Sequence, residues 1–488
     1  MQYKYVALSV TTVGTLMAGV DTRIVVVGLP TIARELGANL EDVIWVSQAY
    51  LLASTIGLLL IGRVTDVIGR VKIYNTGFII FTIGSAFSSL SFTPLELIAA
   101  RVVQGTGAAM LITNSAAILT DASPKAELGT MLGLNQIAFR IGSVAGLTLS
   151  GVILAVTDWR ALFYINIPIG IFGTVWAHLR LRDIAPKDVE TKMDWSGFIT
   201  FSVSLTMILL SITFLSYGIS DALVGWGLAI GGFVLLGMFI RIETHTKAPI
   251  LDLNLFKIRQ FMGGNIAQLL NALAWSGVIL MLSFYFQLAL NYTPLQAGLA
   301  LLPLEATYAI FGPLSGKLSD KYGQRLFSTV GLAVSSAGFF LLSSVAGAFS
   351  YNELIIPIAL LGVGNGMFVS PNISSIMGSV PANRRGIASA FRTTLFNVGL
   401  TASYGLAVLL ITSKLPYAIF SALVEGVTPQ GVTPAAIAEL ISGFKLAVLV
   451  LAVINTTAIV PSFLRGPTTI GAHIEPPENH QADVGAME

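Results

Sequence analysis

The sequence predicts an all-α polytopic membrane protein, with two six-helix bundles and two additional helices that make fourteen transmembrane helices in all. The first observation behind this prediction is composition, because 54% of the 488 residues are hydrophobic and only 11% are charged. Soluble proteins carry about 25% charged residues, so this chain is too apolar for an aqueous surface. The other two observations are a series of long apolar runs and a charged motif that occurs twice.

Each apolar run is long enough to cross a bilayer as a helix, which takes about 20 residues. The first run contains Asp21 and thirteen further runs follow it, so we expect a retained helix and not a signal peptide. The predicted spans, with boundaries good to a few residues, are 5–29, 43–62, 72–91, 96–119, 129–156, 161–180, 196–217, 222–241, 261–290, 296–316, 327–347, 352–378, 387–413 and 443–464.

The positive charges are distributed unevenly between the connections. Most of the 27 lysine and arginine residues lie on one side of the predicted spans, and the other side holds only Arg34, Arg160, Lys414 and Lys445. Cytoplasmic loops of membrane proteins carry the excess of lysine and arginine. The sequence therefore predicts a multi-pass protein of the cytoplasmic membrane with both termini in the cytoplasm.

A charged stretch links the second and third spans. Residues 62–72 read GRVTDVIGRVK, and residues 316–325 repeat the design as GKLSDKYGQR at one constant offset. Glycine permits a sharp turn, and Asp66 can face the positive N-terminus of the next helix while Arg70 pairs with it or with a neighbouring helix end. A solvated loop is the alternative. The residues expected to act in conformational gating are Gly62, Asp66, Gly69, Arg70 and Asp320.

The repeat divides the chain into two halves. Spans five and thirteen support the division, because Arg140 falls opposite Asn397 and Asn135 opposite Arg392. Internal repeats of this kind place a transport site near the midplane of the membrane. The expected parts are an N-terminal bundle (1–182), two inserted helices with linkers (183–260), a C-terminal bundle (261–465) and a polar, disordered tail (466–488).

A few ionisable side chains lie within the spans, where each costs at least about 2.5–3.5 kcal/mol near the bilayer centre. Asp21 with Arg101 is either a proton-transfer pair or a fixed structural ion pair, and the residues alone favour neither. Glu305 is expected to be a second proton site or to recognise a cation, the alternative being a neutral carboxyl bonded to a neighbouring helix.

Other polar residues can line a central cavity. Arg140 and Arg392 can attract an anionic or zwitterionic substrate, or they can pair with carboxylates or backbone carbonyls elsewhere. The expected cavity residues are Asn114, Arg140, Gln268, Asn271, Tyr308, Asn372 and Arg392.

Several motifs resemble those of the major facilitator superfamily, in particular its fourteen-helix drug:proton antiporter family of multidrug-resistance exporters. The repeated stretch at 62–72 resembles the superfamily's signature loop. Residues 21–30 resemble the family's first-helix motif, with Arg23 and Val26 as departures, and residues 101–107 resemble its fourth-helix motif. Residues 159–170, 194–197 and 385–389 are similar to further elements, and 142–151 to the antiporter motif with Leu147 in place of proline.

The resemblance implies proton-coupled export of amphipathic, drug-like compounds by alternating access, with Asp21, Arg101 and Glu305 in proton coupling. The alternatives are a transporter or facilitator of a specific metabolite, lipid or anion, and a non-transporting receptor or scaffold. Zero cysteines, four peripheral histidines and the lack of a phosphate-binding loop argue against an enzyme, a metal site or a cofactor. The expected partners are a small molecule, protons and the lipid bilayer, with no nucleic acid.

Overall fold

The computed structural model describes residues 2–124, 127–184, 194–216, 219–246, 253–345, 347, 350–380, 385–425 and 434–466, and these form helices and no strand. Thirteen segments within this part are long and apolar enough to cross a membrane. The remaining expected span is α3, whose Lys72, Asn75 and terminal serines lower its hydropathy and which packs along α4 and α7. The expected tail lies outside the described residues, apart from Gly466.

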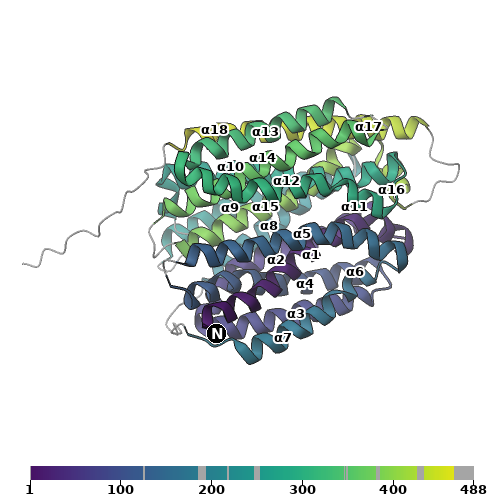
Figure 1. Ribbon diagram of the computed structural model, residues 1–488. Coiled ribbons are helices and arrows are strands. Elements are labelled where there is room, and N and C mark those ends of the chain that lie inside the picture. The colour runs from purple at the N-terminus through teal and green to yellow at the C-terminus, as the bar shows by residue number, and fades with distance from the viewer. Residues whose placement is uncertain are drawn as a thin grey trace, which may run out of the picture.

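The helices fall into two halves, which Figure 1 shows as a purple-to-blue layer and a green-to-yellow layer. The first half contains α1 (Tyr3–Leu36), α2 (Leu40–Ile68), α3 (Arg70–Ser89), α4 (Pro94–Ala122), α5 (Leu128–Val156), α6 (Ala161–Tyr164) and α7 (Asn166–Arg180). The second contains α10 (Arg259–Phe284), the π-helical turn η2 (Tyr285–Ala289), α11 (Pro294–Ala300), α12 (Leu302–Tyr322), α13 (Gln324–Ser344), α14 (Tyr351–Gly378), α15 (Arg385–Thr412), α16 (Tyr417–Glu425), α17 (Pro434–Thr457) and α18 (Ile459–Leu464).

The start of α1 and the end of α18 lie at the same end of the molecule, which we call the terminal end (Figure 1). The opposite end is the far end. Three helices that begin there carry capping boxes, in which side chains satisfy the free N–H groups of the first turn. The capping residues are Asn39 for α2, Thr93 for α4 and Thr293 for α11.

The repeated glycines give both halves the same turn. Gly69 ends α2 with φ 113° and Gly323 ends α12 with φ 97°, a region that favours glycine. Each N–H donates to the carbonyl four residues earlier, Thr65 and Ser319, at 2.9 Å. The expected link from residue 62 to 72 was too long, because α2 continues as a helix through Gly62 to Ile68 and the chain reverses only at Gly69.

Small residues bring α1 and α5 into close contact. A Cβ added at Gly142 would lie 2.3 Å from the Leu16 carbonyl oxygen, and one at Gly146 would lie 2.5 Å from that of Val20. Small residues in the motif at 142–151 therefore let a neighbouring helix pack closely. It fixes the position of α1, which carries Asp21 and Arg23.

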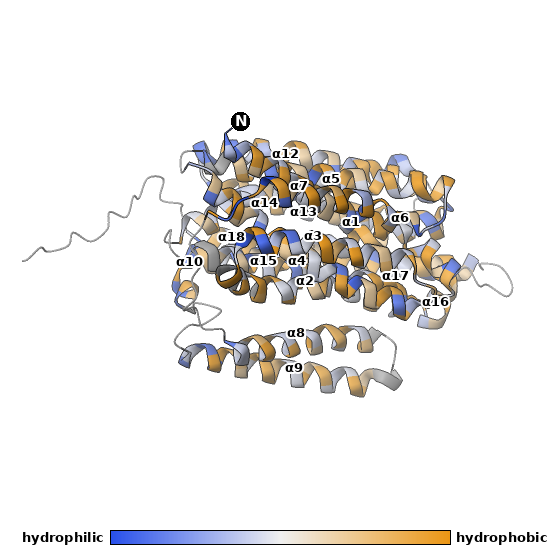
Figure 2. Cartoon of the chain, turned by 90° about the horizontal axis from the view of Figure 1, so that it is seen from below, coloured by the Kyte–Doolittle hydropathy of each residue, from blue (hydrophilic) through white to orange (hydrophobic). Residues whose placement is uncertain are grey.

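The inserted helices α8 (Trp195–Ser216) and α9 (Ile219–His245) lie to one side of the bundle, as Figure 2 shows. Leu205 and Leu209 of α8 pack with Leu52 of α2 and Ala402 of α15, so α8 contacts both halves. By contrast, α9 contacts mainly α8 and exposes large apolar side chains such as Trp226 and Phe233. That exposed face suits lipid better than water. The short 3-10 helix η1 (Leu253–Lys257) leads into α10.

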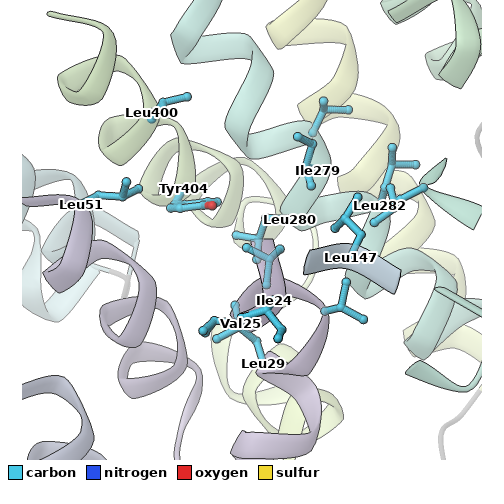
Figure 3. Close-up of a cluster of buried hydrophobic side chains, with 14 of the residues drawn as sticks. Ile24, Val25, Leu29, Leu51, Leu147, Ile279, Leu280, Leu282, Leu400 and Tyr404 are labelled. Atoms are coloured by element: carbon cyan, nitrogen blue, oxygen red, sulfur yellow. The ribbon is translucent and has the colours of Figure 1, made fainter. Parts of the chain in front are cut away.

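One apolar cluster joins the two halves. Figure 3 shows Ile24 and Val25 of α1 beside Leu280 of α10, and Leu147 of α5 near Leu282. Hydrogen bonds across the same interface run from Ser283 to the Val26 carbonyl (3.4 Å) and from Gln287 to that of Val27 (3.1 Å). Further toward the far end, the Leu40 N–H donates to Ser421 Oγ. The halves are therefore closed against each other at the far end.

Candidate functional site

Asp21 lies at the middle of α1, fully buried, and three side chains donate to its carboxylate. Arg101 Nη1 lies 2.8 Å from Oδ2, Gln104 Nε2 lies 2.8 Å from Oδ1, and Asn166 Nδ2 lies 3.1 Å from Oδ1. Gln104 also donates to Ser85 Oγ at 2.8 Å. A buried carboxylate is stable only when it is paired and hydrogen-bonded in this way. Helices α1, α3, α4 and α7 thus meet at a single carboxyl group.

Arg101 has further partners besides Asp21. Its Nε donates to the Val46 carbonyl at 3.0 Å and its Nη1 to Gln104 Oε1 at 2.6 Å. The guanidinium carbon lies 4.2 Å from the centre of the Tyr50 ring, within the range of a cation–π contact. Arg101 therefore remains held in place whether or not Asp21 is charged.

Glycines in α4 bring these groups within reach. A Cβ added at Gly105 would lie 2.4 Å from the Tyr50 carbonyl oxygen, and one at Gly107 would lie 2.4 Å from the Phe81 nitrogen. Gly105 and Gly107 therefore allow close contact between α4 and its neighbours α2 and α3. Gly84 of α3 likewise packs against the Gln104 backbone.

The second half holds a neutral counterpart of this network. Asn271 Nδ2 donates to Asn455 Oδ1 at 2.9 Å, and Asn455 Nδ2 donates to Ser335 and Ser336 at 2.8 and 2.9 Å. These residues lie on the first, third and sixth spans of their half, as Asp21, Ser85 and Asn166 do. Within this pair of networks, only the first contains an acid.

A second charged group lies between the halves, and we call Arg23, Arg140, Glu305, Tyr308 and Arg392 the interface cluster. Arg23 Nε of α1 lies 3.3 Å from Glu305 Oε1 of α12, and both side chains are buried. Arg140 of α5 donates to the Tyr308 hydroxyl, with its guanidinium 4.0 Å from that ring's centre. The charges of Arg23, Arg140, Glu305 and Arg392 all act on Tyr308.

The interface cluster is incompletely paired. Arg23 Nε and Glu305 Oε1 make no hydrogen bond within the part of the chain that the structure describes, and neither does Arg392 Nε. Among the described residues, the acceptor of Arg392 Nη2 is Thr393 Oγ1, at 3.2 Å. Trp275 completes the surroundings, with its ring centre 6.0 Å from that of Tyr308.

The remaining expected cavity residues lie elsewhere. Asn372 accepts from Arg465 Nη1 at 2.7 Å and donates to Gln268 Oε1 at 3.4 Å, toward the terminal end of the second half. Burial, with the Arg325 charge as a smaller cause, lowers the pKa of Arg465 to about 10. Gln268 also donates to the Arg392 carbonyl at 3.3 Å. Asn114 is buried and donates to the Met110 carbonyl of its own helix.

The gating residues lie at the terminal end. Arg70 forms an ion pair with Asp121 at the end of α4, a neighbouring helix end of the kind that the sequence suggested. The carboxylate described at the N-terminus of α3 is that of Asp183. The Val71 N–H donates to Asp183 Oδ1 at 2.9 Å. Asp320 is exposed, and the Asp66 side chain lies outside the described part.

Sequence reasoning did not include several residues that complete these groups. Asn166 lies within the motif at 159–170 and Gln104 within the motif at 101–107, but the sequence assigned neither a partner. Arg23 was identified as a departure without a partner, and Asp121 was not singled out. Among the described residues, no cluster of histidine, aspartate and glutamate side chains can hold a metal ion.

Two halves of six spans that meet around buried charges define a membrane transporter that works on small molecules. The chain matches the family model described as Major Facilitator Superfamily over residues 11–244 and 264–480, and it belongs to that superfamily. It is accordingly a multi-pass membrane transporter and not an enzyme.

Its relatives transport different compounds. The chain is 31% identical over 407 residues to the riboflavin transporter RibZ of Clostridioides difficile (strain 630), covering 82% of this chain and 86% of that protein. It is 26% identical over 404 residues to a tetracenomycin C resistance and export protein of Streptomyces glaucescens, covering 81% and 73%.

A solved structure shares the fold. A bacterial homologue of the human lysosomal transporter Spinster, in an inward-facing and occupied conformation, superposes with a TM-score of 0.63 at 15% identity, covering 95% of this chain and 97% of that one.

Proposed function

We propose that this protein is a proton-coupled antiporter of the fourteen-helix drug:proton family that exports amphipathic compounds across the cytoplasmic membrane. The observation that carries the proposal is the buried Asp21 with its three donors. An ionisable group at the middle of a span is energetically costly, so its presence there points to a function. Relatives that export or confer resistance to drugs support the direction of transport.

Asp21 is the proposed proton carrier. When it takes up a proton, Arg101 loses its negative partner but keeps the Val46 carbonyl, Gln104 and the Tyr50 ring. The neutral acid can still accept from Gln104 and Asn166. Because both charge states are accommodated, a proton can enter and leave without disrupting the four surrounding helices. Glu305, paired with Arg23, is the second candidate for a proton site.

Proton binding is proposed to bias alternating access between the two halves. The halves are closed together at the far end, where Ser283 and Gln287 of α10 bond to α1. If both termini are cytoplasmic, as the charge distribution predicts, the closed end is the external one. Arg70 with Asp121, Asp66, Asp320 and the turns at Gly69 and Gly323 would then govern closure of the cytoplasmic end.

Flux into proteoliposomes under an imposed pH gradient tests the proposal. Wild-type protein should accumulate an amphipathic drug against its gradient only when the pH gradient is present. Asp21→Asn should abolish the accumulation while leaving insertion and monodispersity intact. If protein with Asp21→Asn and Glu305→Gln together still pumps solute uphill, the mechanism is wrong.

A second candidate function is transport of one specific metabolite. Two observations favour it: the three guanidinium groups of the interface cluster, and the similarity to a riboflavin transporter. A facilitator of this kind would give flux of a single compound that does not depend on the pH gradient, which the same proteoliposome assay distinguishes.

A further inference from the structure

The interface cluster has more positive charge than its one carboxylate can balance. Arg23, Arg140 and Arg392 come from α1, α5 and α15, and Glu305 of α12 is the acid among them. Arginine stays protonated in proteins, so the cluster carries a net charge of about +2 even when Glu305 is ionised. Uncompensated charge at this depth is expensive. A partner that supplies negative charge would offset this cost.

The unpaired donors show where such a partner would bind. Arg392 Nε makes no hydrogen bond among the described residues, and its one side-chain acceptor is the neighbouring Thr393. Arg23 Nε faces Glu305 at 3.3 Å without a hydrogen bond. Guanidinium groups bind carboxylates and phosphates through paired N–H donors. Arg23 of the first half and Arg392 of the second therefore each keep an N–H donor without an acceptor among the described residues.

The aromatic rings beside the donors add a second requirement. Trp275 and Tyr308 lie 6.0 Å apart between ring centres, and Arg140 already covers one face of Tyr308 at 4.0 Å. A ligand with a planar aromatic body can pack in the same group, since aromatic pairs prefer centroid separations of about 4.5–7 Å. Asn271 lies one turn before Trp275 on α10, but its side-chain amide donates to Asn455 and is not part of the interface cluster.

We propose that the transported substrate is an organic anion with an aromatic body, bound between the halves by Arg23, Arg140 and Arg392. This inference rests on the proposed transport function and specifies its substrate class. It also predicts that Glu305 opposes binding, because its carboxylate competes with the ligand for Arg23. A cationic drug would instead have to enter a site that repels it.

A set of three fluorescent probes of one size tests the substrate class without any mutation. Anthracene-9-carboxylate, 9-anthracenemethanol and 9-(aminomethyl)anthracene differ only in the charge of one substituent. Binding to detergent-purified wild-type protein should be at least about tenfold tighter for the carboxylate than for the alcohol, and weakest for the ammonium probe. Equal affinities, or a preference for the ammonium probe, would overturn the inference.

Variants then locate the site. Arg140→Gln and Arg392→Gln should each weaken carboxylate binding about tenfold or more, and Arg392→Lys should retain only part of it, because lysine keeps the charge but not the paired donors. Glu305→Gln should tighten it. The matched control is Arg160→Gln, an arginine at the far end that is paired with Asp158 at 2.9 Å and should leave affinity unchanged. Unchanged affinity in Arg140→Gln and Arg392→Gln would place the anion elsewhere and reject this site.

Binding in detergent needs no gradient, so the two proposals fail separately. If the carboxylate probe binds as expected but is never accumulated in proteoliposomes, the proposed proton-coupled function fails and the site assignment survives. If a cationic drug is accumulated through Asp21 while the carboxylate probe does not bind, the substrate class is wrong and the transport function stands.

Discussion

Asn166 and Asn455 occupy equivalent places in the two halves but have different partners. Asn166 donates to the Asp21 carboxylate, whereas Asn455 bonds only to neutral groups. The fold therefore presents one geometry twice and puts an acid in only one copy. Of these two networks, only the one in the first half can change its proton count, so it is the one that we propose binds a proton.

Removing one donor from Asp21 should make proton binding easier. In Asn166→Ala the ionised carboxylate loses a hydrogen bond worth about 1.5–3 kcal/mol, while the protonated form loses less. The pH profile of proton-driven transport should therefore move to higher pH. Transport measured across a series of external pH values gives the shift.

Asn455→Ala is the matched control, because the same side chain is removed from a network without an ionisable group. It should lower thermal stability and leave the pH profile in place. Equal shifts in both variants would mean that Asn166 acts on structure and not on the charge of Asp21.

The Arg23–Glu305 pair gives a second prediction at this scale. Glu305→Gln leaves three guanidinium groups without a carboxylate, and breaking a buried pair costs about 3–5 kcal/mol. Protein without ligand should show a clearly lower unfolding temperature. The double variant with Arg23→Gln should recover part of the loss, because two charges remain in place of three. If the double variant is less stable than Glu305→Gln, the pair is not the source of the effect.

The sequence identified Asp21, Arg101 and Glu305 as unusual because charge within an apolar run can be recognised from one chain position at a time. The partners could not be derived in the same way. Asn166 lies 145 positions from Asp21 and Glu305 lies 282 from Arg23. Their contact depends on how six spans are ordered around one another. A lone asparagine in an apolar helix is compatible with many such arrangements.

At the scale of elements, α5 packs closely against two neighbouring helices through its own glycines. Gly142 and Gly146 meet α1 within its own half, and Gly151 meets α11 of the other half. A Cβ added at Gly151 would lie 2.4 Å from Leu295 Cα, and one at Gly298 would lie 2.5 Å from the Leu147 carbonyl oxygen. The far-end closure thus depends on a contact that a methyl group disrupts.

Gly151→Ala should open the far end. Overpacking costs about 1–3 kcal/mol, which shifts the balance between open and closed forms by about 5- to 150-fold. The chain has no native cysteine, so a single Gln287→Cys reports on this end. Its reaction with a water-soluble maleimide should become faster in Gly151→Ala. Gly133→Ala of the same helix is the control, because nothing lies within 4 Å of the added Cβ.

The sequence marked residues 142–151 as a motif but assigned no partner to Gly151. It also predicted a turn at Gly69 and Gly323, because only glycine suits the positive φ that both adopt. The predicted link between α2 and α3 was too long because it began at Gly62. Charged residues suggested a loop, yet α2 remains helical through them because a helix end can project beyond the apolar layer.

At the scale of the whole molecule, duplication explains why the fold could be predicted so fully. Six spans and a signature link recur in each half, so the constant offset between Gly62 and Gly316 fixes the internal symmetry. Symmetry between the halves says nothing about where they touch. The cross-interface bonds of Ser283 and Gln287 to α1 could be found only from the assembled structure.

The charge distribution predicts the orientation in the membrane, and this prediction can be measured on the same cysteine-free chain. Phe92 is 77% exposed at the far end and Ile184 is 55% exposed at the terminal end. If both termini are cytoplasmic, a membrane-impermeant maleimide should label Phe92→Cys in intact cells and Ile184→Cys only after permeabilisation. The opposite pattern would mean that the orientation is reversed. The excess of lysine and arginine would then face outward, against the usual rule. A reversed orientation would also make the closed far end the cytoplasmic one, so the proposed assignment of the closed end to the outside depends on this measurement.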